Sequence, residues 1–194
     1  DQAPRDRGQH GDQCAADGRC CEPAEVAAVQ ARGRQCGDEH YRHRAKTVGI
    51  AGFEKLLALK RLAPRYAHDP RFLRSFVDEA RIAVALNHRN IVQVYDFGKA
   101  DGELYLAMEL IDGLDLRTAR ARAAERGVDI GLDLACYIMA DLASGVDHAH
   151  GKTDDQGRSL GIVHCDISPH NVMLSRDGYV KILDFGIARA EFTL

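Results

Sequence analysis

Residues 164–171 read His164-Cys165-Asp166-Ile167-Ser168-Pro169-His170-Asn171, and thirteen residues after Asn171 comes Asp184-Phe185-Gly186. Asp166 and Asn171 flank a loop between two short apolar runs, and Asp184 follows the next apolar run. Hard cations such as Mg²⁺ prefer a few oxygen ligands together with phosphate oxygens. The spacing therefore predicts that Asn171 and Asp184 hold Mg²⁺, while Asp166 orients an attacking hydroxyl or accepts its proton.

A lysine well upstream lies on a predicted strand. Residues 56–60 are apolar except for Lys60, which ends the run, and this predicts a buried strand. Asp69-Pro70 then predicts a helix start, because a capping side chain precedes proline at the first helical position. The helix is expected to continue to about Leu86.

One glutamate lies on the apolar stripe of this helix. Phe76, Glu79, Ala83 and Leu86 follow the 3-4-3 spacing of a single helix face. A carboxylate that faces inward needs a cation, because burying it alone costs several kcal/mol. An ion pair between Lys60 and Glu79 is therefore predicted, the alternative being a rotated helix with Glu79 in solvent.

The remaining pattern predicts an α+β chain in two parts. Strands are expected over 91–97 and 104–110, joined by a hairpin at 99–102, where Asp-Gly is a strong turn signal. Helices are expected over 116–126 and 132–150, followed by short strands at 162–163, 172–174 and 179–183. The first 49 residues contain no Leu, Ile, Phe or Met, so they are expected to be mobile or poorly packed.

These motifs, in this order, resemble the eukaryotic-like Ser/Thr protein kinase family, particularly its bacterial members, over roughly residues 41–189. The resemblance implies a two-lobed fold with an N-lobe over 41–112 and a partial C-lobe over 113–194. A poorly ordered segment with a degenerate glycine loop would precede it over 1–40. The implied reaction transfers the γ-phosphoryl group of Mg²⁺-ATP to a Ser or Thr hydroxyl of a protein substrate.

The resemblance also assigns roles to residues around the nucleotide. Lys60 would hold the α- and β-phosphates and Glu79 would fix Lys60. Met108 would occupy the gatekeeper position, the backbone at Glu109 and Ile111 would hydrogen-bond adenine, and Asp115 would reach the ribose. The further ATP-binding positions implied are Gly33, Ala58 and Met173.

Several positions depart from the family pattern. Residues 33–40 occupy the slot of the glycine-rich loop, but only Gly33 is in place. Gln35 and Asp38 obstruct a loop whose amides should close over phosphates, and the Asp38 carboxylate would repel them. Cys165 replaces the usual arginine, and Ser168 stands where Ser/Thr kinases usually have a lysine. Asp96-Phe97-Gly98 repeats the metal-binding triplet but lacks an upstream D-x-x-x-x-N, so a strand end is the better interpretation.

Two rival interpretations depend on these departures. A pseudokinase scaffold, or an ATP-binding signalling module without phosphotransfer, would explain the eroded glycine loop. A kinase-fold phosphotransferase acting on small molecules is the second rival. The intact Asp184-Phe185-Gly186 triplet and the Lys60/Glu79 arrangement favour a protein kinase over it.

Composition limits the other possibilities. The 194 residues carry 26 Lys plus Arg against 29 Asp plus Glu, a formal charge of −3, which gives no basic face for nucleic acid. No apolar stretch approaches the length of a membrane span. The six cysteines show no paired C-x-x-C spacing, so reduced thiols are favoured over a zinc site. We expect a cytoplasmic fragment of a longer protein, whose other parts could include a membrane anchor.

Overall fold

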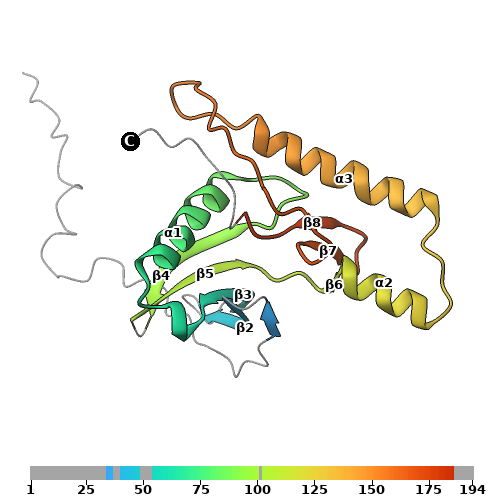
Figure 1. Cartoon of the computed structure of the whole chain (residues 1–194), viewed down its shortest axis with the longest axis horizontal. Helices are drawn as coiled ribbons and strands as arrows, with labels where there is room; N and C mark the ends of the chain where they lie inside the picture. Colours follow the sequence, from blue (N-terminus) through green and yellow to red (C-terminus); the bar gives the residue numbers. More distant parts are fainter. Residues whose placement is uncertain (1–33, 37–39, 49–53, 101, 186–194) are drawn as a thin grey trace, which may run out of the picture.

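The computed structural model describes residues 34–36, 40–48, 54–100 and 102–185. Figure 1 shows two sheets with three long helices: α1 lies by the larger sheet, while α2 and α3 lie on the side of the smaller one. The strands and helices alternate irregularly along the chain, so the expected α+β class is confirmed. Gly33, Cys14, Cys20, Cys21 and Gly186 lie outside the described residues.

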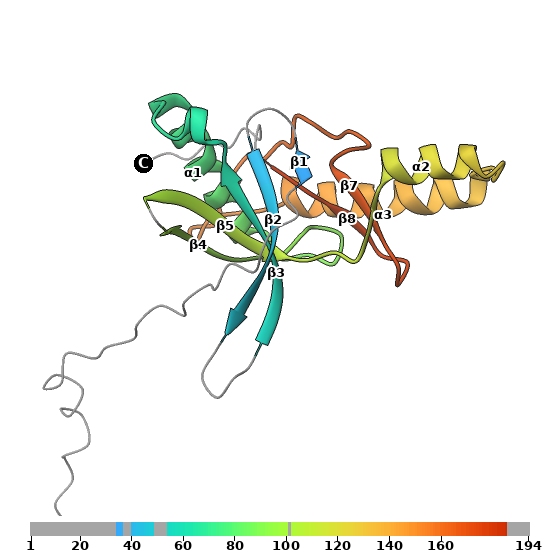
Figure 2. The same ribbon diagram turned by 90° about the horizontal axis from the view of Figure 1, so that it is seen from below.

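The larger sheet is antiparallel, with the strand order β1-β2-β3-β5-β4. Its strands are β1 (Arg34–Cys36), β2 (His40–Val48), β3 (Glu54–Leu62), β4 (Val94–Ala100) and β5 (Glu103–Glu109). Figure 2 shows the long β2 and β3 side by side, with one end of the pair projecting from the rest of the sheet. The register of β3 and β5 places Ala58 opposite Met108 and Lys60 opposite Leu106. This pairing brings the lysine strand next to the segment expected to contact adenine.

Helix α1 (Pro70–Ala85) begins where the sequence predicts. The Asp69 carboxylate accepts a hydrogen bond from the backbone N–H of Arg71 at 2.9 Å, and Pro70 occupies the first turn. Phe76, Glu79 and Ala83 are all buried, as the predicted stripe requires. Glu79 therefore faces the sheet rather than solvent.

The second part of the chain combines helices with a three-stranded sheet of order β6-β7-β8. Its elements are β6 (Gly113–Asp115), α2 (Leu116–Glu125), α3 (Leu132–His150), β7 (Val172–Ser175) and β8 (Val180–Ile182). A tight turn joins β7 to β8, and there Gly178 has a φ of 84°, which glycine adopts without a Cβ clash. The two helices agree with the predictions for 116–126 and 132–150.

The segment before β4 connects the two parts. The backbone N–H of Ile182 donates to the carbonyl of Asn90 at 2.7 Å, and the N–H of Val92 donates to the carbonyl of Ile182 at 2.9 Å. The predicted strand at 91–97 is therefore wrong at its start: 91–93 lie beside β8, and β4 begins only at Val94. One core cluster continues across this junction, since Ile82 and Leu86 pack with residues of α3 and β8.

Two further expectations need correction. The first 49 residues were expected to pack poorly, but β2 is a nine-residue strand and its Ala45 is only 1% exposed. Strand pairing with β3 compensates for the lack of large apolar side chains in β2. Residues 162–163 form no strand of the described sheets, although Ile162 is buried in the core. No helix among the described residues has the length and apolar character needed to cross a membrane.

Candidate active site

Lys60 lies between two carboxylates in the interior. Its Nζ is 2.5 Å from Oε1 of Glu79 and 3.3 Å from Oδ1 of Asp184. The side chains of Lys60 and Glu79 are each only 3% exposed, and that of Asp184 is 14% exposed. The predicted ion pair is present. Because two carboxylates face one ammonium group, the cluster can accept a further positive charge at Asp184.

Asp184 has a backbone conformation that is rare outside glycine. Its φ is 48°, in the left-handed region. The next residue, Phe185, is 2% exposed and packs in the core, with its ring centroid 4.6 Å from that of His164. A backbone forced into an uncommon region at a buried site is typical of positions where geometry serves function. The core packing of Phe185 holds the carboxylate of Asp184 toward Lys60.

His164 links the loop of Asp166 to the strand end that carries Asp184. Its Nδ1 accepts the backbone N–H of Asp166 at 3.2 Å, and its Nε2 lies 3.0 Å from the carbonyl of Leu183. Nε2 must therefore carry the proton, which is the neutral tautomer. Burial lowers the pKa of His164, and the hydrogen bond to Leu183 only partly offsets this effect. The buried imidazole positions the loop, as expected for a packed residue rather than a catalyst.

Asp166 and Asn171 contact each other across the loop. Nδ2 of Asn171 donates to Oδ2 of Asp166 at 2.7 Å and to its backbone carbonyl at 3.1 Å. The side-chain nitrogen of Asn171 is thus directed at Asp166, so its Oδ1 is the atom that can bind a metal. Asn171 is 7% exposed, while Asp166 is half-buried and reachable from solvent.

The oxygen atoms of Asn171 and Asp184 fit Mg²⁺, which takes one or two protein carboxylate or amide ligands and completes its shell with water and phosphate. Within the described residues, no cluster of three or more His, Cys, Asp or Glu side chains forms a metal cage. Asn171 and Asp184 are thus the candidates for holding Mg²⁺ beside Lys60.

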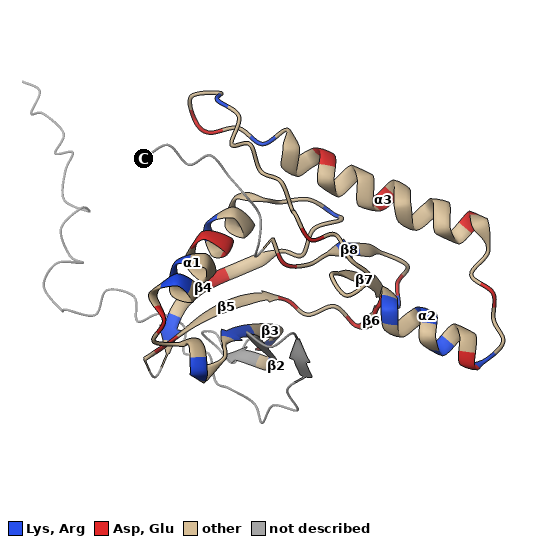
Figure 3. Ribbon diagram, in the orientation of Figure 1, with Lys and Arg blue, Asp and Glu red and all other residues tan. Residues whose placement is uncertain are grey.

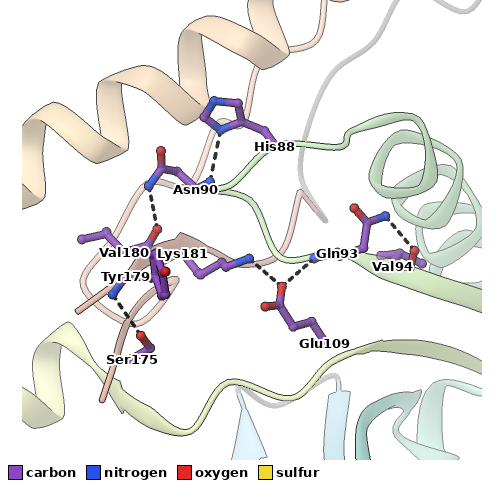
Figure 4. A network of polar contacts seen from close by, with 9 residues as sticks. All are labelled: His88, Asn90, Gln93, Val94, Glu109, Ser175, Tyr179, Val180 and Lys181. Carbon is purple, nitrogen blue, oxygen red and sulfur yellow. Dashed lines mark hydrogen bonds and ion pairs between the residues drawn. The ribbon is translucent and has the colours of Figure 1, made fainter. Parts of the chain in front are cut away.

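Glu109, at the end of β5, connects the two parts of the chain. Figure 4 shows its carboxylate between Lys181 of β8 and the backbone of Gln93. Oε2 accepts from Nζ of Lys181 at 2.7 Å and from the N–H of Gln93 at 3.3 Å. The backbone N–H of Glu109 donates to the carbonyl of Gln93 at 2.8 Å. Of the backbone groups at Glu109, the carbonyl is therefore the one suited to adenine, and Ile111 follows two residues beyond the strand.

The other predicted nucleotide positions come from separate strands. Ala58 of β3, Met108 of β5 and Met173 of β7 pack in one hydrophobic cluster. Beside Met108 lies a small apolar pocket that also borders the ion cluster; its lining includes Glu79, Ala83, Leu106, Asp184 and Phe185. The sheet pairing thus collects an apolar surface next to the charged groups.

Asp115 is engaged at the start of α2. Its carboxylate accepts from the N–H of Thr118 at 2.8 Å and from the Thr118 hydroxyl at 2.7 Å. Burial alone would raise the pKa of Asp115, but the two hydrogen bonds from Thr118 outweigh it and hold this pKa below its usual value. The residue is a helix cap as well as a candidate for the ribose, and a contact to ribose would share its oxygens with Thr118.

Two of the positions that depart from the family pattern, Cys165 and Ser168, belong to the loop that carries Asp166. Cys165 is exposed with a φ of 62°, and Ser168 is half-buried. The slot of the glycine loop falls on the β1–β2 hairpin, with Gly33 and residues 37–39 outside the described part. Asp96 lies within β4, where it accepts a hydrogen bond from the Tyr105 hydroxyl at 2.9 Å. The Asp96-Phe97-Gly98 triplet therefore lies inside a strand, whereas the sequence pattern predicts a strand end.

Three contacts were missed at the sequence level. Lys181 binds Glu109, Nδ2 of Asn90 donates to the carbonyl of Val180 at 3.0 Å, and Arg117 contacts His170. Each joins residues more than 50 positions apart. No local periodicity indicates such pairs, although Asn90 is a buried polar residue between apolar runs and could have been singled out.

A strand lysine paired with a helix glutamate, beside an aspartate and a loop that carries an asparagine, is an arrangement typical of nucleotide-dependent phosphotransferases. The family model described as "Protein kinase domain" matches residues 49–192. The chain belongs to the protein kinase family, and the resemblance found in the sequence is confirmed.

Curated relatives agree with this assignment. The chain is 41% identical over 150 residues to the tyrosine-protein kinase MasK of Myxococcus xanthus, a match that covers 77% of this chain and 23% of that protein. It is 36% identical over 140 residues to the serine/threonine-protein kinase PrkC of Bacillus subtilis, covering 71% of this chain and 19% of PrkC. The chain thus spans about a fifth of the length of these relatives.

A solved structure gives the same fold. The kinase domain of PknI from Mycobacterium tuberculosis superposes with a TM-score of 0.63 at 30% sequence identity. The match covers 84% of this chain and 59% of the PknI chain. Membership in the family implies ATP as a co-substrate and, as is typical of kinases, Mg²⁺.

Proposed function

We propose that the protein transfers the γ-phosphoryl group of Mg²⁺-ATP to Ser or Thr hydroxyls of protein substrates. The observation that carries the proposal is the position of Lys60, with its Nζ 2.5 Å from Glu79 and 3.3 Å from Asp184. A kinase needs this lysine and the aspartate side by side, because one binds phosphate oxygens and the other the metal that bridges them.

In this proposal each residue of the site has a defined task. Glu79 holds Lys60, which binds the α- and β-phosphates through its ammonium group. Asp184 and Oδ1 of Asn171 would hold Mg²⁺, and a metal there would supply positive charge next to the transferred group. Asp166 orients the acceptor hydroxyl and takes up its proton; the hydrogen bond from Asn171 fixes its carboxylate.

The adenine and ribose have proposed binding groups as well. Ala58, Met108 and Met173 supply the apolar surface for adenine, with polar contacts from the carbonyl of Glu109 and the backbone of Ile111. Asp115 receives the ribose; the predicted role of Gly33 falls outside the described residues. The requirement for ATP and the unpaired thiols of Cys136 and Cys165 support a cytoplasmic location for the reaction.

A phosphotransfer assay tests the proposal. The whole protein is incubated with γ-labelled ATP, Mg²⁺ and a protein acceptor, and the labelled amino acid is identified after hydrolysis. We expect phosphoserine or phosphothreonine, and loss of at least about 100-fold in rate for Asp166→Ala and Lys60→Met. Undiminished transfer by either variant contradicts the site assignment, and phosphotyrosine as the main product contradicts the acceptor class. Absence of transfer by the unaltered protein, with ATP still bound, supports the scaffold instead.

A further inference from the structure

Helix α2 is attached directly to the loop that carries Asp166. The backbone N–H of Arg117 donates to the carbonyl of Pro169 at 3.1 Å, and Nη1 of Arg117 lies 2.6 Å from Nε2 of His170. Both partners belong to the loop of residues 164–171. The first turn of α2 therefore has a fixed place beside the residue proposed to orient the acceptor hydroxyl.

Arg117 retains its positive charge in this contact. A guanidinium group only donates hydrogen bonds, so Nε2 of His170 must be the acceptor and the imidazole is neutral in this geometry. Arginine has five N–H donors, and the contact with His170 is made through one nitrogen. Both side chains are exposed, so the remaining donors of Arg117 are accessible to another molecule.

The carboxylates of the residues just before Arg117 contact other side chains and not Arg117. Asp115 directs its oxygens at Thr118, and Asp112 pairs with Arg176, with Nε and Oδ1 3.2 Å apart. In the part of the chain that the structure describes, Arg117 forms no ion pair with a carboxylate. Arg120 lies one turn further along the same side of the helix and is also exposed. Figure 3 shows basic colour at several places along α2 and acidic colour at its far end.

Arg117 contacts a residue that lies close to Asp166 along the chain. His170 follows Asp166 by four residues, and Arg117 touches His170. An extended peptide advances about 3.3–3.6 Å per residue. Four residues of chain keep the Cα atoms of Asp166 and His170 within about 14 Å of each other, so a substrate segment that runs from Asp166 toward α2 would pass Arg117 within about four positions of the acceptor.

We infer that Arg117, held by His170, selects acceptor segments with an Asp or Glu side chain within about four residues of the phosphorylated hydroxyl. The guanidinium fork can bind a carboxylate through two parallel hydrogen bonds, a geometry that lysine does not offer. A basic residue at the same substrate position would meet like charge. This inference rests on the proposed kinase function and adds the class of acceptor sequence.

Peptide kinetics test the inference in the whole protein. Two peptides share one acceptor residue and differ only in having Asp or Lys at the flanking positions. We expect KM for the Asp peptide to be about fivefold lower than for the Lys peptide, with similar kcat. Arg117→Glu should reverse the order, and Arg117→Lys should keep it with a smaller ratio. The matched control is Arg122→Glu, on the same helix and exposed, which should leave the ratio unchanged.

A binding measurement separates this inference from the proposed function. Labelled Asp and Lys peptides are titrated into the Asp166→Asn protein with ATP and Mg²⁺, and the fluorescence anisotropy gives Kd without turnover. Tighter binding of the Asp peptide that Arg117→Glu removes supports the inference even if no phosphotransfer is found. Equal Kd values for the two peptides, or equal losses in the Arg117→Glu and Arg122→Glu variants, overturn it whether or not the protein is active.

Discussion

The chain contains two Asp-Phe-Gly triplets that share their letters and differ in everything around them. The first, at residues 96–98, lies in β4, and its aspartate accepts a hydrogen bond from an exposed tyrosine hydroxyl. The second begins at Asp184, which has a φ of 48° and lies 3.3 Å from the buried ammonium of Lys60. Its phenylalanine is 2% exposed, whereas Phe97 is only partly buried.

The comparison shows that the contacts around a motif, and not its sequence alone, determine what the motif can bind. Among the described residues Asp96 forms no ion pair, and its carboxylate accepts a hydrogen bond from Tyr105 of the neighbouring strand. Asp184 lies beside Lys60 of β3, which pairs with Glu79 of α1. A metal bound at Asp184 would therefore lie next to the lysine proposed to bind phosphate. Matched substitutions in the two triplets therefore separate the effect of the triplet's sequence on rate and stability from the effect of its surroundings.

The largest expected difference is in the rate of phosphotransfer after substitution of the two aspartates. We expect Asp184→Asn to reduce the rate of phosphotransfer about a thousandfold, because the variant loses a charged metal ligand. Asp96→Asn should leave the rate within twofold. Initial rates with γ-labelled ATP at saturating Mg²⁺ measure both. Similar losses in the two variants would show that the second triplet is not the metal site.

The phenylalanines should differ in stability. Phe185→Ala removes a ring from the core that α3, β7 and β8 share, which should lower the free energy of unfolding by about 3–5 kcal/mol. Phe97→Ala should have roughly half that effect, because Phe97 packs at the margin of its cluster, 6.1 Å from the ring of Phe76. Urea unfolding followed by circular dichroism measures both. A larger loss at Phe97 would contradict the burial described above.

The region of the second triplet should also respond to pH through His164. Burial lowers the pKa of His164, so the unfolded chain takes up a proton at a higher pH than the native protein does. Stability is therefore complete above about pH 6.5 and falls as the pH drops from there toward the lowered native pKa.

Substitution of His164 checks this pH dependence. His164→Asn should reduce the difference in urea midpoint between pH 7 and pH 5, and substitution of the exposed His68 by Asn should not. Part of the slope should remain, because burial also lowers the pKa of His88. An unchanged slope in His164→Asn would argue against the neutral bridging imidazole.

The smallest effect concerns the hydrogen bond of the first triplet. Tyr105→Phe removes the donor to Asp96 at an exposed position, so the free energy of unfolding should fall by no more than about 1 kcal/mol. Phosphotransfer should be unchanged. Thermal unfolding and rate measurements on the same preparation test this, and a loss of activity would show that β4 is coupled to the site.

Much of the architecture could be predicted from local pattern. The cap at Asp69 and the apolar stripe that includes Glu79 are properties of a few neighbouring residues, and the structure contains both. The ion pair of Lys60 and Glu79 followed from one physical requirement, that a buried carboxylate needs a cation.

Other features depend on contacts that no local pattern encodes. Strand β2 has few apolar residues, and its alternation of charged and uncharged positions becomes informative only once β3 pairs with it. The start of β4 differs from the prediction because Ile91 and Val92 are as apolar as strand residues but pair with Ile182 of β8. Lys181, which binds Glu109, resembles any strand lysine in the sequence, and only the fold brings it to the end of β5.

Magnesium-dependent binding of ATP tests the central claim most directly, that Lys60, Glu79 and Asp184 surround one Mg²⁺-ATP. Thermal unfolding of the protein is measured with ATP alone and with ATP plus Mg²⁺, for the unaltered protein and for Asp184→Asn. We predict a higher midpoint with Mg²⁺ present, by an amount that grows with ligand concentration, and loss of this increment in Asp184→Asn. Equal midpoints with and without Mg²⁺ in the unaltered protein, or an increment that survives in Asp184→Asn, would contradict the account.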